Sequence, residues 1–305
     1  MPAEGVPLLP ADQLLTPDEI VRLARIGVTR LGVTMVRLTG GEPLLAMHLE
    51  DIVAATAAFP QRPEIALTTN GVRLAGRAQA LARAGLDRVN VSLDSIDSAR
   101  FAATTRRDRL ADVLAGLAAA HAAGLRPVKV NAVLDAQTGL DDVVPLTRFC
   151  LDNDYQLRII EQMPLDAGHQ WHRAAWVSAD QVLAELRRRC FTPESDEAPR
   201  GTAPAELWRV RDPVTARTGK VGVIASVSHP FCSTCDRARL TADGQLRSCL
   251  FASAETDLRG LLRGGADDTA IEAAWRQAMW GKPMGHGIND PGFVQPVRPM
   301  SAIGG

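Results

Sequence analysis

The sequence is poor in aromatic residues and in cysteine, and it has no long apolar run. Aromatic residues make up 4% of its 305 residues, and there are five cysteines. No stretch approaches the roughly 20 apolar residues of a membrane-spanning helix, and Met1-Pro2-Ala3-Glu4 lacks the charged and apolar regions of a signal peptide. An odd number of cysteines fits a metal site plus core thiols in a reducing compartment. We therefore expect a soluble, cytoplasmic protein.

The sequence also lacks an excess of charge of either sign. Its 34 Lys and Arg residues face 35 Asp and Glu residues, a formal net charge of −1. A general nucleic-acid or membrane surface needs a strong positive balance, so we expect neither partner, and any anion site must be local. The length suffices for one α/β barrel or two domains.

Three of the five cysteines lie in one short stretch. Cys232, Cys235 and Cys249 have the spacing C-x2-C-x13-C. The polar run between the last two contains Asp243-Gly244, a strong hairpin signal. A hairpin brings Cys249 back beside Cys235.

The loop length of this hairpin decides which face Cys249 occupies. Side chains alternate along a strand, so Cys235, Arg237 and Arg239 share one face. A three-residue loop, Ala242–Gly244 with its glycine at positive φ, places Cys249 opposite Arg237, whereas a two-residue loop places it on the other face. We predict the three-residue loop, because it gathers all the functional side chains.

Three thiolates on one face suit a metal centre better than disulfides. A [4Fe-4S] cluster held by three cysteines keeps one iron open for a substrate atom, whereas His229 could complete a Cys3His zinc site. Arg237 and Arg239 favour the cluster, since forked cations suit a substrate with phosphates or carboxylates. Three unrelated buried cysteines remain the plainest alternative. Cys150 and Cys190 stand alone, and we interpret both as packing residues.

Up to about residue 163, helical stretches alternate with short β-rich ones. The predicted strands are 35–38, 65–69, 88–93, 127–134 and 156–162, and the helices between them include 77–84, 109–123 and 140–153. This repetition predicts parallel strands with right-handed crossovers, a barrel or part of one, with an open doubly wound sheet as the alternative. Further on we expect a helix at 178–190, strands at 207–210 and 219–226, the hairpin, and a helix at 268–279.

One face of several predicted strands is polar. Arg37, Lys129 and Arg158 each stand singly in an apolar strand, and an unpaired buried cation is costly, so each needs an anion. Internal salt bridges to Asp94 or Glu161 would serve for single cations. Three cations on three strands, together with the hairpin arginines, favour a phosphorylated ligand in the lumen of the barrel.

The turn Thr39–Pro43 follows a strand and precedes a helix. As structure it is a tight βα turn. As chemistry, its two glycines let the backbone approach a ligand closely, and Glu42 can bind an ammonium group.

Together these motifs resemble the GTP 3′,8-cyclases, radical S-adenosylmethionine enzymes that begin molybdenum-cofactor biosynthesis. The resemblance covers essentially the whole chain. It rests on Arg37-Leu-Thr-Gly-Gly-Glu-Pro-Leu-Leu45, Leu67-Thr-Thr-Asn-Gly71, Val91-Ser-Leu-Asp94, Val128-Lys-Val-Asn131, Arg158-Ile-Ile-Glu-Gln-Met163, Ser228-His-Pro-Phe-Cys232, the cysteine hairpin and Gly304-Gly305.

The resemblance implies a fold and a set of functional residues. The fold is α/β, an incomplete (βα)6 TIM-like barrel over residues 1–165 with a C-terminal α+β cluster-binding domain over 166–305. It implies a [4Fe-4S] cluster on Cys232, Cys235 and Cys249, and catalytic roles for Gly304 and Gly305. S-adenosylmethionine would contact Gly41, Ser92 and Met163. GTP would contact Arg37, Thr68, Lys129, Arg158, Arg237, Ala238 and Arg239.

The family also needs a second, N-terminal [4Fe-4S] cluster on a C-x3-C-x2-C loop, and this sequence contains no such motif. Met1–Gly5 resembles the residues directly after that loop. We therefore expect a cyclase whose given sequence begins past the loop, without the first barrel strand, and which is inactive as written. The alternatives are a non-catalytic GTP-binding or regulatory chain and a zinc-stabilised nucleotide-binding barrel. The implied partners are an electron donor, the downstream cyclic pyranopterin monophosphate synthase and a second copy in a homodimer.

Overall fold

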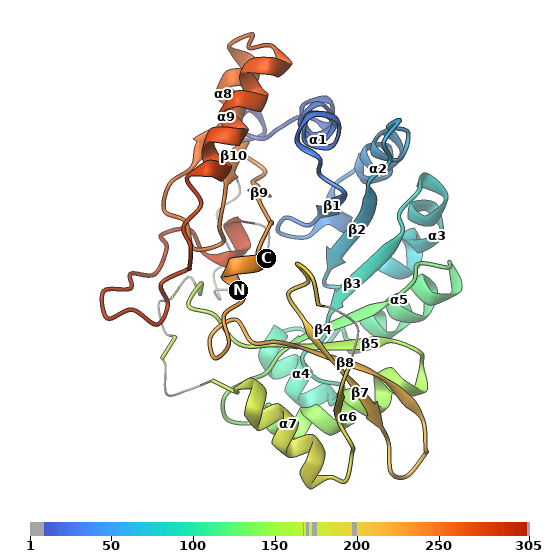
Figure 1. Ribbon diagram of the computed structural model, residues 1–305. Coiled ribbons are helices and arrows are strands. Elements are labelled where there is room, and N and C mark those ends of the chain that lie inside the picture. The colour runs from blue at the N-terminus through green and yellow to red at the C-terminus, as the bar shows by residue number, and fades with distance from the viewer. Residues whose placement is uncertain (1–8, 167, 169–170, 173–175, 197–199, 304–305) are drawn as a thin grey trace.

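A curved sheet covered by helices makes up most of the molecule (Figure 1). The computed structural model describes residues 9–166, 168, 171–172, 176–196 and 200–303. The main sheet contains β1 Met35–Leu38, β2 Glu64–Thr69, β3 Arg88–Ser92, β4 Lys129–Val133, β5 Gln156–Ile160, β6 Glu194–Ser195, β7 Glu206–Arg211 and β8 Thr218–Ile224. A small sheet contains β9 Arg239–Leu240, β10 Gln245–Arg247 and β11 Thr256–Asp257.

Nine α-helices lie in the described residues. They are α1 Pro17–Leu31, α2 Leu49–Ala57, α3 Leu74–Ala84, α4 Ser98–Thr105, α5 Leu110–Ala122, α6 Leu140–Asp152, α7 Ala179–Arg188, α8 Leu258–Arg263 and α9 Asp268–Trp280. Capping boxes at Thr16 and Ser178 fix the starts of α1 and α7. None of these helices is long and apolar enough to cross a membrane.

The strand order of the main sheet is β1-β2-β3-β4-β5-β8-β7-β6. The first six strands in this order are parallel, and β7 and β6 continue the sheet in antiparallel fashion. From β1 to β5 each strand lies beside the one that precedes it in the sequence. A doubly wound sheet would instead start in its middle and reverse its strand order there. The predicted partial barrel is therefore confirmed, and the doubly wound alternative is wrong.

All seven strands predicted before the hairpin are present, with ends that shift by at most a few residues. Helices α4 and α8 were not predicted, and α2 was expected only as a helix without bounds after the turn Thr39–Pro43. Helix α4 buries only Phe101, so it has no periodic apolar face that a sequence pattern could reveal.

The described residues form two apolar cores. The larger core lies between the main sheet and its helices, and it contains Leu67, Val91 and Val130, which were predicted to face the helices. The smaller core joins α1 to α8, α9 and β10, and Figure 1 shows α1 beside the C-terminal helices. The main sheet continues past residue 165, because β8 pairs with β5. The division at residue 165 stays a prediction.

Candidate active site

Polar side chains line up in rows across the parallel strands. The register pairs Thr68 with Asn90 and Asn90 with Lys129, and one row further on it pairs Ser92 with Asn131 and Asn131 with Arg158. Residues in register on neighbouring strands point to the same face. The polar face predicted from the alternation of the strands therefore forms one continuous surface opposite the large core.

Three cations on this face have no counter-ion in the described part of the chain. Lys129 and Arg158 are each only 8% exposed, and Nε of Arg158 is buried without a hydrogen-bond partner. Arg37 lies on β1, and its recorded polar contact is Nη2 to the sulfur of Met35 at 3.8 Å. Buried cations without partners indicate a site for an anion.

The two carboxylates considered as internal partners are engaged elsewhere, so the salt-bridge alternative is wrong. Glu161 accepts hydrogen bonds from the backbone N–H groups of Ala179 at 2.9 Å, Val227 at 2.8 Å and Ser228 at 2.9 Å, and from the Ser228 hydroxyl at 2.5 Å. Asp94 accepts a bond from the Val133 N–H at 2.8 Å, and burial raises the pKa of Asp94 to about 6.

Crowding of these cations changes their proton affinity. Burial and the nearby arginines, Arg158 first among them, lower the pKa of Lys129 to about 7. Burial and the charge of Arg37 lower the pKa of Arg158 to about 10. The side chain of Arg37 is exposed, unlike those of Lys129 and Arg158, yet enough protein surrounds it that burial, with Arg88, lowers its pKa to about 10 as well. A bound polyanion would reverse these effects.

Arg88 belongs to the same cluster and was not singled out from the sequence. It is 5% exposed, pairs through Nε with Glu64, and donates from Nη1 to Asn90 Oδ1 at 3.4 Å. The signal was available, because Arg88 stands two residues before Asn90 on one strand and therefore faces the same side. The charge of Glu64 acts against the lowering of the pKa values of Lys129, Arg158 and Arg37.

The cysteine hairpin has the predicted register. Leu240 pairs with Leu246 and Arg239 with Arg247. At the loop, the Thr241 N–H donates a hydrogen bond to the Gln245 carbonyl at 2.9 Å. The loop is therefore the three residues 242–244, and Gly244 has φ 78°. The two-residue loop is excluded.

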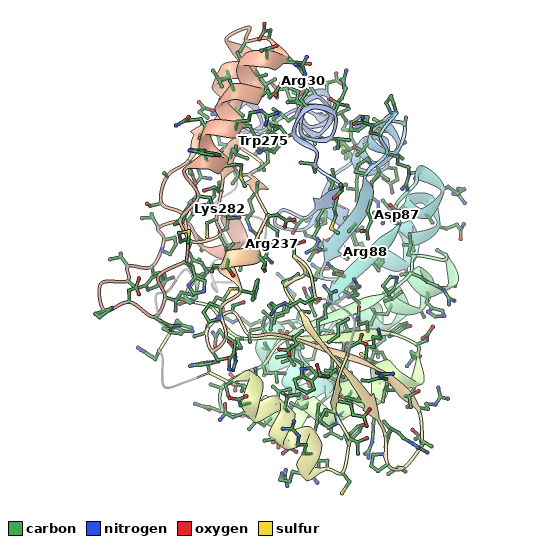
Figure 2. The ribbon with its side chains drawn as sticks, in the orientation of Figure 1. Arg30, Asp87, Arg88, Arg237, Trp275 and Lys282 are labelled. Carbon is green, nitrogen blue, oxygen red and sulfur yellow. The ribbon has the colours of Figure 1, made fainter. Side chains whose placement is uncertain are left out.

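The hairpin presents its arginines toward the cationic face of the barrel. Burial and the neighbouring arginines lower the pKa of Arg239 to about 10. One of these arginines is Arg37, on β1. Arg237 lies across from Arg88 in Figure 2, and its charge acts on Arg37. Arg239 also donates from Nη1 to the carbonyl of Ile303 at 3.2 Å. Sequence-predicted residues from both parts of the chain are thus brought to one place.

Cations surround the thiol of Cys235. Arg237 donates to Sγ from Nε at 3.3 Å and Nη2 at 3.2 Å, and Lys282 Nζ lies 3.5 Å away. Burial acts to raise the pKa of Cys235, but these hydrogen bonds and charges outweigh it, and the pKa is lowered. Burial and the other two thiols raise the pKa of Cys232, against a hydrogen bond from the backbone of His286.

The three thiols influence one another, but the described residues contain no group of three or more His, Cys, Asp or Glu side chains arranged to hold a metal ion. Cys232, Cys235 and Cys249 are all free and half-buried. His229 is exposed, and its Nδ1 lies 3.0 Å from the Ser228 hydroxyl. The ligand set of the cluster therefore stays a prediction.

The residues predicted to bind S-adenosylmethionine lie at or just after the carboxyl ends of three parallel strands. Gly41, in the turn after β1, is exposed, and a Cβ there would meet no atom within 4 Å. Ser92 is exposed at the end of β3, and Met163 follows β5 and is half-buried. Of the remaining predicted site residues, Ala238 is exposed on the hairpin, and Gly304 and Gly305 lie outside the described residues.

Glu42 holds the turn after β1 onto the end of β2. Its carboxylate accepts hydrogen bonds from the Leu44 N–H at 3.0 Å, the Thr69 hydroxyl at 2.6 Å and the Asn70 N–H at 2.7 Å. These bonds fix the backbone of Gly40 and Gly41. Binding of an ammonium group by Glu42 remains a prediction.

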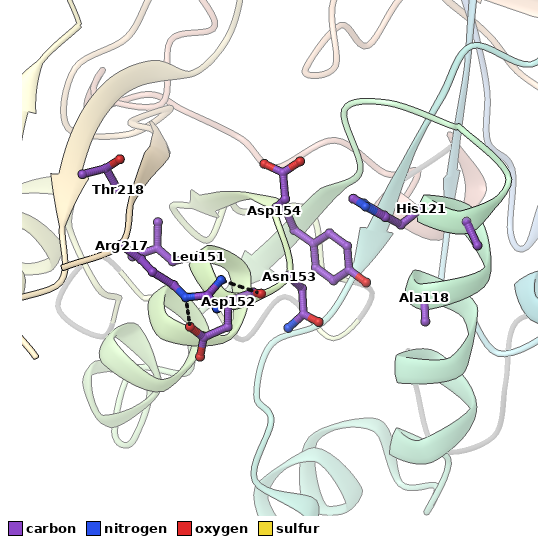
Figure 3. A pocket seen from close by; sticks show the side chains of 10 residues that line it. Ala118, His121, Leu151, Asp152, Asn153, Asp154, Arg217 and Thr218 are labelled. Carbon is purple, nitrogen blue, oxygen red and sulfur yellow. Dashed lines mark hydrogen bonds and ion pairs between the residues drawn. The ribbon is translucent and has the colours of Figure 1, made fainter. Parts of the chain in front are cut away.

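A hollow at the opposite ends of the strands is a separate feature (Figure 3). It lies beside the starts of β5 and β8, and Tyr155 and His121 line it. Its charged groups have partners, since Arg217 pairs with Asp152 at 3.2 Å and Asp154 with Arg126 at 3.7 Å. It lies away from the cationic face.

Two family models match the chain, the Radical SAM superfamily over residues 5–150 and Molybdenum Cofactor Synthesis C over residues 155–288. The chain is thus a radical S-adenosylmethionine protein of the molybdenum-cofactor type. It is 72% identical over 305 residues to GTP 3′,8-cyclase 2 of Mycobacterium tuberculosis (strain ATCC 25618 / H37Rv), covering 100% of this chain and 84% of that protein. With GTP 3′,8-cyclase of Mycobacterium marinum the identity is 70% over the same shares. The chain belongs to the GTP 3′,8-cyclase family.

Among solved structures, coproporphyrinogen III oxidase from Escherichia coli, a radical SAM enzyme, is similar with a TM-score of 0.42 and 16% sequence identity. The match covers 59% of this chain and 46% of that chain.

Proposed function

We propose that this protein acts in the conversion of GTP to (8S)-3′,8-cyclo-7,8-dihydroguanosine 5′-triphosphate in molybdopterin biosynthesis, a reaction for which these 305 residues alone hold no C-x3-C-x2-C set and are expected to be inactive. The observation that carries the assignment to GTP is the cationic face, on which Arg37, Lys129 and Arg158 have no counter-ion in the described chain. A triphosphate carries several negative charges and matches this surplus. We expect the product to pass to cyclic pyranopterin monophosphate synthase in the cytoplasm.

We assign three basic side chains to the phosphates of GTP and further residues to the same nucleotide. Lys129 and Arg158, buried on β4 and β5, are placed to neutralise the phosphates together with Arg37. Thr68 accepts a hydrogen bond from Asn90 Nδ2 at 3.2 Å, which leaves its own hydroxyl proton for the ligand. We assign the hairpin segment Arg237–Arg239 to the same GTP.

Cys232, Cys235 and Cys249 are the ligands that we assign to one [4Fe-4S] cluster. The donor set fits, because the cations around Cys235 favour its thiolate, and the thiolate is the form that binds metal. Three thiolates leave one iron of such a cluster open to a further ligand. The family uses a second cluster with S-adenosylmethionine, which supplies a carbon-centred radical when bound. The five cysteines of this sequence include no C-x3-C-x2-C set for that cluster.

The chain contributes positioning and exclusion of water. Gly41, Ser92 and Met163, at or just after the carboxyl ends of β1, β3 and β5, are the residues that we assign to S-adenosylmethionine. Gly304 and Gly305 are assigned to the active site as catalytic residues. The assigned partners are an external electron donor and a second copy in a homodimer.

Anaerobic reconstitution of the 305-residue chain tests the cluster assignment. We expect about four irons and four sulfides per protein, the content of one such cluster. Cys150 is buried, as expected of a packing residue, but Cys190 is exposed, so its interpretation as a packing residue is wrong. A Cys235→Ser variant should lose most of this iron, whereas Cys190→Ser, outside the hairpin, should keep it. One zinc with no sulfide, or equal iron in the two variants, would contradict the assignment.

Binding of GTP to the same preparations tests the assignment to the lumen. We expect Arg158→Met to weaken GTP binding roughly 10- to 100-fold, because an ionic hydrogen bond to phosphate contributes about 1.5–3 kcal/mol. Arg209→Gln removes an exposed cation from β7 and should leave the affinity unchanged. Equal affinities in both variants would place the GTP elsewhere.

A further inference from the structure

The C-terminal segment is fastened to the loop of the cysteine hairpin by one arginine. Arg298 donates two parallel hydrogen bonds to Asp243, from Nη1 to Oδ1 at 3.0 Å and from Nη2 to Oδ2 at 2.8 Å. Its Nη2 also lies 3.0 Å from Glu255 Oε2. Asp243 is the middle residue of the three-residue loop that separates Cys235 from Cys249.

These groups are partly withdrawn from solvent, which strengthens the contact. The side chains of Arg298, Asp243 and Glu255 are 30%, 15% and 18% exposed. Burial acts to raise the pKa of Asp243, but the hydrogen bonds from Arg298 outweigh it and the pKa is lowered. Bidentate pairing of arginine with a carboxylate is geometrically selective as well as strong. The contact therefore fixes the direction in which the chain leaves Arg298.

Beyond Arg298 the chain runs along the barrel and ends at the hairpin arginines. The Met300 N–H donates to the carbonyl of Leu165 at 2.9 Å, two residues past Met163. Ile303 is 1% exposed, and its carbonyl accepts the hydrogen bond from Arg239. The last described residue of the chain is thus held against an arginine of the cationic face.

We propose that Arg298 is a positioning residue, which latches residues 299–303 onto the hairpin loop so that Ile303 is held against Arg239. The latch couples the hairpin that carries the cysteines to the segment that leads into Gly304 and Gly305. The latch itself stands on the contacts above, and its importance for turnover rests on the proposed function.

Amide hydrogen exchange of the nucleotide-free protein tests the latch. The N–H groups of Met300, Ala302 and Ile303 are hydrogen-bonded and report directly on this segment. In Arg298→Gln we expect their exchange to accelerate about tenfold or more, since a charged hydrogen-bonded pair contributes about 1.5–3 kcal/mol. Asp243→Asn should do the same from the other side of the contact.

The control is Arg276→Gln, which removes an arginine that pairs with Glu272 on α9, away from this segment. It should leave the exchange at residues 299–303 unchanged.

The double variant Arg298→Gln/Asp243→Asn should exchange no more than about threefold faster than either single variant, because both substitutions remove the same interaction. Unchanged exchange in Arg298→Gln, additive effects in the double variant, or equal acceleration in Arg276→Gln would each overturn the proposal. Should Arg298→Gln fold poorly, Arg298→Lys keeps the charge without the fork and should show a smaller acceleration.

Binding of GTP separates this proposal from the preceding one. Arg298→Gln should bind GTP within about threefold of the parent, since Arg298 positions the segment and does not contact phosphate. A loss of more than tenfold would overturn the positioning role. Failure of the parent to bind GTP would contradict the proposed function and leave the exchange result for the latch standing.

Discussion

Lys282 donates a hydrogen bond to the backbone carbonyl of Arg237 at 2.8 Å, joining the segment after α9 to the cysteine hairpin. The same ammonium lies 3.5 Å from Cys235 Sγ. Lys282 therefore fixes the backbone of an arginine and the charge environment of a neighbouring thiol at once.

This arrangement predicts the reactivity of Cys235. In Lys282→Met the pKa of Cys235 should rise, because one of the charges that stabilise its thiolate is gone. Since only the thiolate attacks alkylating agents, alkylation of Cys235 in the metal-free protein near neutral pH should slow by about fivefold, the effect of roughly 1 kcal/mol. Site-resolved mass spectrometry across pH measures this. Lys220→Met, which removes a lysine paired with Asp196, is the control, and the same pH profile in both variants would refute the prediction.

The buried ammonium of Lys129 predicts how stability changes with pH. Its pKa is lowered from 10.5 to about 7 in the folded protein, so between these values the unfolded chain binds a proton that the folded chain does not. The contribution of Lys129 to the free energy of unfolding therefore becomes more favourable as pH rises from about 7 to 10.5. Lys129→Met should remove this gain, so that the difference in stability between variant and parent narrows from pH 7 to pH 10. Urea unfolding at several pH values measures the difference, and a gap that does not change with pH would contradict the assigned pKa.

Bound GTP should restore the proton to Lys129. A triphosphate next to the ammonium favours its charged form, so binding at pH 8 should take up protons from the buffer. Titration calorimetry in two buffers with different ionisation enthalpies counts these protons. We expect an uptake of several tenths of a proton or more in the parent and less in Lys129→Met, as the lowered pKa of about 7 implies. Equal uptake in both proteins would assign the proton to another group.

The loop glycine of the hairpin predicts a difference between two similar substitutions. Gly244 and Gly265 both have positive φ, 78° and 82°. A Cβ on Gly244 would lie 2.5 Å from the Cβ of Arg259, whereas a Cβ on Gly265 would meet nothing within 4 Å. Gly265→Ala should cost about 1–2 kcal/mol of backbone strain, and Gly244→Ala clearly more. Chemical denaturation compares them, and iron retention should fall only in Gly244→Ala. Equal costs would show that the loop yields around the new methyl group.

The sequence allowed the prediction of what local chemistry determines. The hairpin register followed from the requirement that cysteines and arginines share a face, and the strand Met35–Leu38 was predicted to the residue. The rows of polar residues were predicted from the alternation of side chains alone. The same reasoning, applied to Arg88, would have included it in the predicted cationic cluster.

Long-range partners could not be predicted in this way. The carboxylate of Glu161 binds the N–H groups of Val227 and Ser228, which lie 66 and 67 positions away, and no local pattern indicates that these groups compete with Arg158 for it. Likewise, nothing in the local sequence indicated the partner of α1. Gly27 lies close to Trp275 of α9, where an added Cβ would be 3.3 Å from the indole ring.

The second apolar core has a consequence for synthesis of the chain. It joins α1 to α8 and α9, and Arg22 reaches Asp268 across 246 positions of sequence. Translation proceeds at about 5–20 residues per second, so α8 and α9 are synthesised roughly 10–50 seconds after α1. During this time the apolar face of α1 has no α8 or α9 to pack against. The barrel can assemble its own core during this interval. Helix α1, which carries Leu23 and Ile26 on that waiting face, is then exposed to chaperones and to other nascent chains until the last helices leave the ribosome.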